Sequence, residues 1–277
     1  MSRSGLDVSL VPVVLAVYAS AALAYGLLWS SRFRLAKIPA TVLMSVGLGL
    51  NLFQIVYRWV TIEQPPFKTL YESLLLLAVC IAIVYLVIEG VYRLRILGLP
   101  SALGAGATVL YAFLQVEKEA VNLPAALQSG WFIPHVVVYF FGYAALFVGT
   151  AAAAIYLLRP APIRLGRRDL TGSREIDVEG FMSSSVRFGF VLLTTGLLMG
   201  AFWAKAAWGD YWVWDPKETW SLVTWLVYAA YLHLRFMSGW KGRKLAVVAI
   251  VGFAAVMFTY LGMNVLPTAE SSLHVYQ

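Results

Sequence analysis

The chain has 277 residues, of which 61% are hydrophobic and 13% charged, with a mean hydropathy of +0.77. A soluble protein of this length cannot bury so much apolar surface, so the composition excludes a soluble globular domain and indicates a polytopic membrane protein. The net charge of +7 is concentrated in alternate loops, which indicates membrane topology and not nucleic-acid binding.

Eight apolar runs are long enough to span a bilayer. In chain order they are roughly Val8–Trp29, Thr41–Val60, Leu70–Tyr92, Ile96–Leu114, Pro134–Leu158, Phe188–Trp203, Thr219–Leu234 and Leu245–Met263. The first run lacks a small-residue cleavage site, so we expect a retained helix and not a cleaved signal. The third and fourth runs are so close that they should form a helical hairpin. The sequence predicts a single all-α integral membrane domain, residues 1–277, with about eight transmembrane helices.

The basic residues indicate how these helices are oriented. The loops after the first, third, fifth and seventh runs hold 15 of the 21 Lys and Arg residues. Cytoplasmic loops carry such an excess of Lys and Arg, so residues 159–187 should form a cytoplasmic loop. Both termini and the loop 204–220 should lie on the extracytoplasmic, or periplasmic, side of a multi-pass plasma-membrane protein.

The stretch 208–220, Trp-Gly-Asp-Tyr-Trp-Val-Trp-Asp-Pro-Lys-Glu-Thr-Trp, places five aromatic and four charged side chains between two apolar runs. Aromatic residues collect at membrane interfaces, and such a belt accounts for Trp203, Trp59 and Trp131. It accounts poorly for a loop in which aromatic and charged residues alternate. A dense set of flat aromatic side chains suits a flat, apolar and partly charged ligand such as haem.

Within this stretch, Asp215 and Glu218 have the spacing of a capping box, with Pro216 at the first helical position. We therefore expect Asp215 to begin the seventh helix. A helix N-terminus carries partial positive charge, which would favour a haem propionate.

The chain contains three histidines. His135 and His274 are both predicted on the outer side, where two imidazoles could provide the axial ligands of a bis-histidine haem. His233 is predicted near the cytoplasmic end of the seventh helix, where it either has a function or simply extends to the interface. Thirteen residues, or roughly 20 Å of helix, separate it from Trp220, so one haem cannot contact both.

Other polar residues within spans are harder to interpret. Glu72 either complements the N-terminus of the third helix or lines an outer vestibule. Arg58 and Gln54 have no role that the sequence reveals. The lone Cys80 is typical of a small buried residue, and the absence of a Cys-x-x-Cys motif argues against disulfide relay or thiolate zinc binding.

From Arg187 to Arg235 the chain resembles the tryptophan-rich "WWD" haem-handling proteins, of the CcsA/ResC type of cytochrome c synthesis system II. Leu70-Tyr71-Glu72-Ser73 and the region around His135 add to the resemblance. Its main motifs are Gly196, Gly200-Ala201-Phe202-Trp203-Ala204, Trp208-Gly209, Tyr211-Trp212, Trp214-Asp215-Pro216-Lys217-Glu218-Thr219-Trp220 and Trp225-Leu226-Val227-Tyr228 with His233.

The resemblance implies a haem exporter and haem lyase that acts with a CcsB/ResB-type membrane partner. Such proteins carry haem b to the outer face and present it to an apocytochrome c with a Cys-x-x-Cys-His motif. The cysteine thiols then form thioether bonds with the haem vinyl groups. The implied haem-binding residues are His135 and His274 as outer axial ligands, His233 as a ligand of a haem shared with the partner, and Trp208, Trp212, Trp214, Asp215 and Trp220.

The tail departs from the family pattern, because the segment between Asn264 and His274 is longer and poorer in glycine. An alternative is a CcmC-type haem chaperone, against which the eight spans and the tail histidine argue. A dihaem b-type electron carrier would need histidine pairs at two depths, which three histidines cannot supply. A membrane assembly factor that binds no haem stays open, and the sequence reveals no general acid or base.

Overall fold

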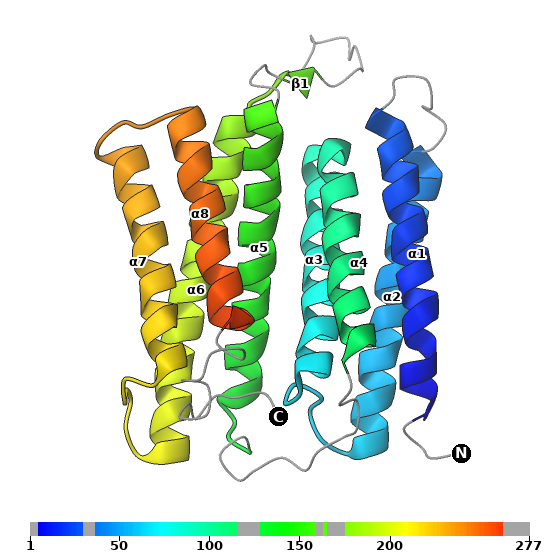
Figure 1. Cartoon of the computed structure of the whole chain (residues 1–277), viewed down its shortest axis with the longest axis vertical. Helices are drawn as coiled ribbons and strands as arrows, with labels where there is room; N and C mark the ends of the chain where they lie inside the picture. The colour runs from blue at the N-terminus through cyan, green and yellow to red at the C-terminus, as the bar shows by residue number, and fades with distance from the viewer. Residues whose placement is uncertain (1–4, 30–36, 116–127, 159–162, 165–174, 263–277) are drawn as a thin grey trace.

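The computed structural model describes residues 5–29, 37–115, 128–158, 163–164 and 175–262. Within these ranges, eight long helices lie side by side (Figure 1). A single-turn 3-10 helix, η2, precedes α4, and the two-residue strands β1 and β2 pair antiparallel. The elements are α1 (Gly5–Trp29), α2 (Lys37–Ile62), α3 (Leu70–Tyr92), η2 (Arg95–Leu97), α4 (Gly98–Leu114), α5 (Phe132–Leu158), β1 (Ile163–Arg164), β2 (Glu175–Ile176), α6 (Val178–Trp208), α7 (Pro216–Phe236) and α8 (Arg243–Tyr260).

Seven of these helices are long and apolar enough to cross a membrane, and α7 is the eighth long helix. The prediction of an all-α membrane fold with about eight spans is therefore confirmed. The 21 residues of α7 extend about 31 Å, enough to span a bilayer. Its lower hydropathy reflects side chains with partners inside the protein: Thr224 Oγ1 lies 2.8 Å from Thr259 Oγ1 of α8, and Ser221 Oγ donates to the Lys217 carbonyl at 2.5 Å.

Successive helices alternate in direction, so the connections gather at two ends (Figure 1). The lower end in this view holds the start of α1, the α2–α3 connection and the α6–α7 connection. The upper end holds the short η2 link between α3 and α4, the strands, and the α7–α8 connection. The predicted hairpin is confirmed. Among the described residues, the α2–α3 and α6–α7 connections, which were predicted on the same side of the membrane, lie at the same end of the bundle.

The sixth helix is longer than predicted. It begins at Val178 and ends at Trp208, whereas the apolar run covered only Phe188–Trp203. The expected loop 159–187 therefore ends before Val178, and the loop 204–220 is reduced to Gly209–Asp215 between α6 and α7. The charged Arg187 does not break the helix, because its guanidinium donates to Ser184 Oγ at 2.9 Å and its Cζ lies 5.6 Å from the centroid of the Phe236 ring.

Helices α5 and α6 pack closely along a seam of small residues. A Cβ atom on Gly189 would lie 2.6 Å from Leu146 Cγ, and one on Gly196 would lie 2.3 Å from Tyr139 Cδ2. A Cβ atom on Gly142, on the facing helix, would lie 3.3 Å from Leu192 Cβ, which is a tight but less restrictive contact. Without a hydrophobic driving force inside a bilayer, such close backbone approach supplies the packing energy that holds two helices together.

A buried ion-pair network ties α1, α2 and α3 together at the lower end. Arg58 donates to Asp7 Oδ2 at 2.6 Å and to Glu72 Oε1 at 2.8 Å, and all three side chains are nearly inaccessible to solvent. Glu72 also completes a capping box with Thr69 at the start of α3. The first-turn interpretation of Glu72 is thus confirmed, and its burial contradicts a role in lining an open vestibule. Gln54 donates to the Asp7 carbonyl at 2.5 Å.

A second buried carboxylate lies at the upper end of the same helices. Glu89 of α3 accepts hydrogen bonds from the hydroxyls of Tyr25, Tyr85 and Thr41 at 2.6 to 2.8 Å, and it pairs with Arg95 at 2.8 Å. Both oxygens of the carboxylate are therefore engaged, as a buried charge requires.

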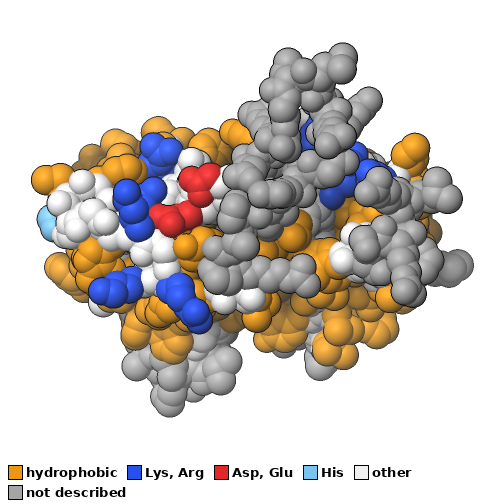
Figure 2. All heavy atoms as spheres, turned by 90° about the horizontal axis from the view of Figure 1, so that it is seen from above, with side chains coloured by type: hydrophobic (Ala, Val, Ile, Leu, Met, Phe, Trp, Pro, Cys, Tyr) orange, Lys and Arg blue, Asp and Glu red, His pale blue; other side chains and the backbone are white. Residues whose placement is uncertain are grey.

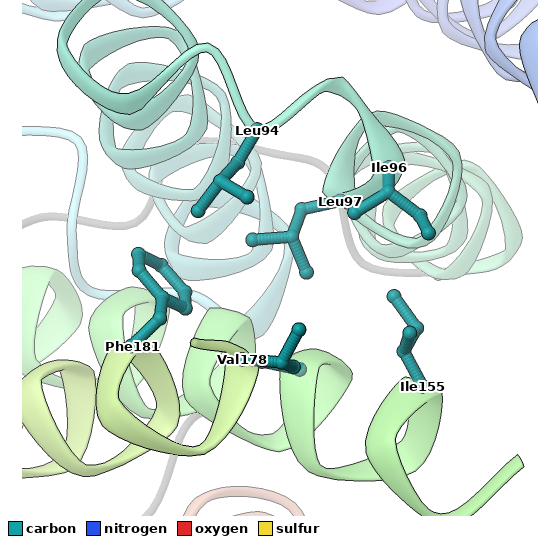
Figure 3. Close-up of a pocket in the computed structure, with 7 residues that line it drawn as sticks. Leu94, Ile96, Leu97, Ile155, Val178 and Phe181 are labelled. Carbon is teal, nitrogen blue, oxygen red and sulfur yellow. The ribbon is translucent and has the colours of Figure 1, made fainter. Parts of the chain in front are cut away.

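The groups α1–α4 and α5–α8 touch at both ends of the bundle. At the lower end, the hydroxyls of Ser73 and Tyr260 lie 2.8 Å apart. At the upper end, Tyr92 packs edge-on against Phe181, beside a small apolar pocket that Figure 3 shows. The residues lining that pocket are Leu94, Ile96, Leu97, Ala152, Ile155, Val178 and Phe181.

Candidate haem site at the Trp-rich end

His135 lies in the first turns of α5, half-buried against α6. Its Nδ1 is 2.8 Å from the carbonyl oxygen of Gly196. Because a carbonyl can only accept, Nδ1 must be the protonated nitrogen, and Nε2 of the neutral ring then carries the lone pair. Histidines that bind a metal commonly have this arrangement, in which one ring nitrogen donates to the backbone and the other is the ligand.

Trp203 provides one wall of this site. Its ring lies nearly parallel to the His135 ring, with centroids 5.8 Å apart and an angle of 23° between the planes. The same indole contacts Phe132 at 5.7 Å and Trp208 edge-on at 4.8 Å. The belt interpretation of Trp203 is wrong, because only 4% of the residue is exposed. Trp203 therefore connects His135, through direct ring contacts, to Trp208 at the end of α6, where the Trp-rich loop begins.

The loop between α6 and α7 has a fixed backbone. Gly209, with φ of 90°, ends α6, and Trp214 adopts a left-handed φ of 59°, which is rare for a bulky residue. One carboxylate oxygen of Glu218 accepts from the amides on either side of Trp214, those of Val213 at 2.9 Å and Asp215 at 3.2 Å. This pair of hydrogen bonds holds Trp214 in its strained conformation.

The tryptophans in the loop and at the start of α7 differ in their surroundings. Trp214 is 68% exposed, and its ring meets that of Trp212 edge-on at 5.9 Å. The Trp212 Nε1–H is buried with no hydrogen-bond partner among the described residues, so the loop holds a donor that a polar ligand atom could use. Trp220 packs on Phe258 of α8, with centroids 4.3 Å apart.

The predicted capping box is confirmed. The Asp215 side chain accepts from the Lys217 amide at 2.8 Å, and Glu218 accepts from the Asp215 amide. Two carboxylates of the protein thus already occupy the N-terminus of α7, which disfavours a third negative charge there and makes it a poor place for a haem propionate.

His233 lies at the opposite end of α7 and is exposed. It is therefore separate from His135 and the loop, as the sequence predicted. Figure 2 shows Lys and Arg side chains gathered around acidic ones on this upper end, over α6, α7 and α8. Near the same ends of α7 and α6, Arg235 and Glu179 form an ion pair, 2.7 Å apart. His274 lies outside the described residues.

The structure thus brings together His135 and Trp208, and adds residues that the sequence analysis did not assign to the site. Gly196 supplies the carbonyl for Nδ1, and a Cβ on Gly200 would lie 2.7 Å from His135 Cε1. The sequence does contain a pattern that could have indicated these residues. Gly196 and Gly200 form a Gly-x-x-x-Gly pair, and Trp203 falls on the same helical face.

Comparison with known proteins places this chain in a family. The curated protein "Cytochrome c biogenesis protein CcsA" from Chlamydomonas reinhardtii is 36% identical over 85% of this chain and 67% of its own length. Proteins of the same name from Prochlorococcus marinus strain MIT 9301 and Gloeobacter violaceus are 35% and 33% identical, over 85% and 94% of their lengths.

Among solved structures, "Cytochrome c Heme Lyase CcmF" aligns with a TM-score of 0.67 over 94% of this chain and 47% of that one, at 19% identity. This likeness shows a shared helical fold. Residues 67–269 match the model of the family described as Cytochrome C assembly protein, a range that includes His135, the Trp-rich loop and His233. The chain belongs to the cytochrome c assembly protein family and has a role in cytochrome c biogenesis.

Proposed function

We propose that this protein binds haem b at the end that carries the Trp-rich loop and attaches it there to apocytochrome c. The reaction would be that of a holocytochrome c synthase, in which the thiols of a Cys-x-x-Cys-His motif add to the haem vinyl groups. A CcsB/ResB-type membrane subunit would be the partner. The Trp-rich end would face the periplasm, because the loops that the sequence assigns to the other side hold 15 of the 21 Lys and Arg residues.

The observation that carries the proposal is the environment of His135. Its Nδ1–H is engaged by the Gly196 carbonyl, which leaves Nε2 as the nitrogen with a lone pair to offer the iron. The ring lies beside Trp203, which touches Trp208, the last residue of α6 before the loop. A haem whose iron is bound by His135 would therefore lie next to an aromatic surface.

The contribution of the protein to the chemistry is positioning. His135, with His274 as the second axial ligand, would hold the iron, and the exposed Trp214 would contact the porphyrin face. The buried Trp212 N–H is a donor for a polar atom of the bound molecule. Holding haem in one orientation turns the encounter with a cysteine thiol into a proximity-assisted step.

His233 would serve a second haem position at the other end of α7. The helix places it about 26 Å from the loop, counted from Pro216 by the helical rise. It would take up haem from the cytoplasmic side, with the other axial ligand supplied by the partner subunit. Haem would then move to the outer site.

The test is an absorption spectrum of the protein, purified with its partner subunit, before and after dithionite. We expect a Soret band with sharp reduced α and β bands. In His135→Gly these bands should weaken, and added imidazole should restore them. In His233→Gly total haem should fall, because loading at the upper end would be lost.

Undiminished bis-histidine haem in His135→Gly would exclude His135 as a ligand. No haem under haem-replete expression would instead favour a biogenesis factor that binds no haem. Normal haem content and normal cytochrome c yield in His233→Gly would reduce His233 to an interfacial residue.

A further inference from the structure

Three residues on one face of α6 surround the His135 ring. Gly196, Gly200 and Trp203 are spaced four and three residues apart, so they project towards α5 from successive turns. Gly196 contacts Nδ1 through its carbonyl, Trp203 lies along the ring face, and the missing side chain of Gly200 leaves the space that the ring occupies. The arrangement therefore restricts the position of the ring, the orientation of its plane and its tautomer.

We propose that Gly200 and Trp203 are positioning residues that set the orientation in which His135 presents Nε2 to the haem iron. The inference rests on the proposed function, since it concerns the same ligand. It goes further, because it attributes the orientation of the iron-binding imidazole to residues of α6 and not to residues of the loop.

The distances at Gly200 show how little freedom the ring has. A Cβ at this position would lie 2.7 Å from Cε1 and 2.9 Å from Nδ1 of His135. Even alanine would therefore push the ring away from the Gly196 carbonyl. The ring could then neither keep the 2.8 Å hydrogen bond that fixes its tautomer nor remain parallel to Trp203.

Trp203 limits the ring from another direction. With 4% exposure and contacts to Phe132 and Trp208, its indole cannot swing away to let His135 rotate. Tyr139, one turn after His135, packs against the ring at 5.0 Å and against the Gly196 position. Residues that orient a metal-bound histidine in this way are typically worth about 10- to 100-fold in metal affinity.

The experiment measures imidazole binding in the His135→Gly background, where the free ligand must fill the space left by the ring. Titration of the partner-containing complex, followed by its Soret and reduced α bands, gives an apparent Kd for imidazole. We expect that adding Gly200→Ala weakens this binding about tenfold or more, because the new methyl group occupies the same space. Trp203→Phe, a milder change, should also weaken it.

The matched control is Gly189→Ala. It lies on the same face of α6, and its Cβ would lie 2.6 Å from Leu146 Cγ, so the steric strain on the α5–α6 seam is comparable. It contacts no part of His135, and the imidazole Kd should stay at the value of the parent variant. With His135 present, Gly200→Ala alone should yield a spectrum with partial loss of the low-spin bands, which Gly189→Ala should not.

The outcomes separate the two proposals. If His135→Gly has full haem or never responds to imidazole, the ligand assignment fails, and this inference fails with it. If His135→Gly responds but Gly200→Ala and Trp203→Phe leave the Kd unchanged, the positioning role is overturned while the proposed function stands. Equal effects of Gly189→Ala and Gly200→Ala would also overturn it, and if Gly200→Ala does not fold, Trp203→Phe decides.

Discussion

Trp214 is the residue at which conformational strain and exposure coincide. A left-handed φ of 59° costs free energy for any residue with a Cβ, and a 68% exposed indole recovers little of it through packing. The Glu218 carboxylate maintains the conformation by binding the amides on both sides of Trp214. Such a combination is explained by function more readily than by stability, because the protein keeps a bulky residue where glycine would fit better.

Replacing Trp214 by glycine should therefore stabilise the haem-free protein relative to Trp214→Ala. Both variants lose the indole, but only alanine keeps the Cβ that makes the left-handed conformation costly, and the difference should be about 1 kcal/mol. Both should bind less haem than the parent. Equilibrium unfolding of haem-free protein in detergent provides the stability comparison, and a glycine variant less stable than the alanine variant would contradict the strain argument.

The helices show which features a sequence can and cannot predict. Apolar length alone located the spans, since crossing a bilayer requires about 20 apolar residues. It missed the first ten residues of α6, because Arg187 ended the apolar run while its charge is accommodated by Ser184 and the ring of Phe236. Local capping was predictable at Asp215, because both partners lie within four residues.

Long-range partners could not be predicted in the same way. Arg58 pairs with Asp7, 51 residues away, and neither side chain indicates the other in the sequence. The Gly196 carbonyl that fixes the His135 tautomer is 61 residues from the ring it binds. For the same reason the sequence assigned Trp203 to the interface, although its position opposite His135 depends on how α5 packs on α6.

Arg58 should be critical for the packing of α1, α2 and α3. Its replacement by methionine keeps an apolar stem of similar size but leaves the buried carboxylates of Asp7 and Glu72 without their cation. Breaking a buried ion pair from one side typically costs about 3–5 kcal/mol. Thermal unfolding in detergent should show a large decrease in melting temperature for Arg58→Met. The exposed Arg243→Met is the control, and equal melting temperatures would mean that the network contributes no stability.

In the molecule as a whole, the helices run between two ends that differ in their chemistry. The lower end carries the Trp-rich loop and His135, and the upper end carries His233 and a surface rich in Lys and Arg (Figures 1 and 2). Moving haem between these positions requires about one bilayer thickness of travel, which no side-chain motion can provide. The proposed transfer of haem would therefore need a route along the helices or along the surface of a partner.

The orientation of the two ends can be tested with single cysteines. Cys80 is buried within α3 and should not react with a membrane-impermeant maleimide, so the parent protein provides a low background. Asp210→Cys, in the exposed loop between α6 and α7, should be labelled in intact spheroplasts, because the positive-inside bias predicts that this loop lies outside. Ser238→Cys, exposed between α7 and α8, should react only after permeabilisation. The reverse pattern would place the Trp-rich loop in the cytoplasm and exclude attachment of haem to a periplasmic cytochrome, whereas labelling of both from outside would mean that α7 does not cross the membrane.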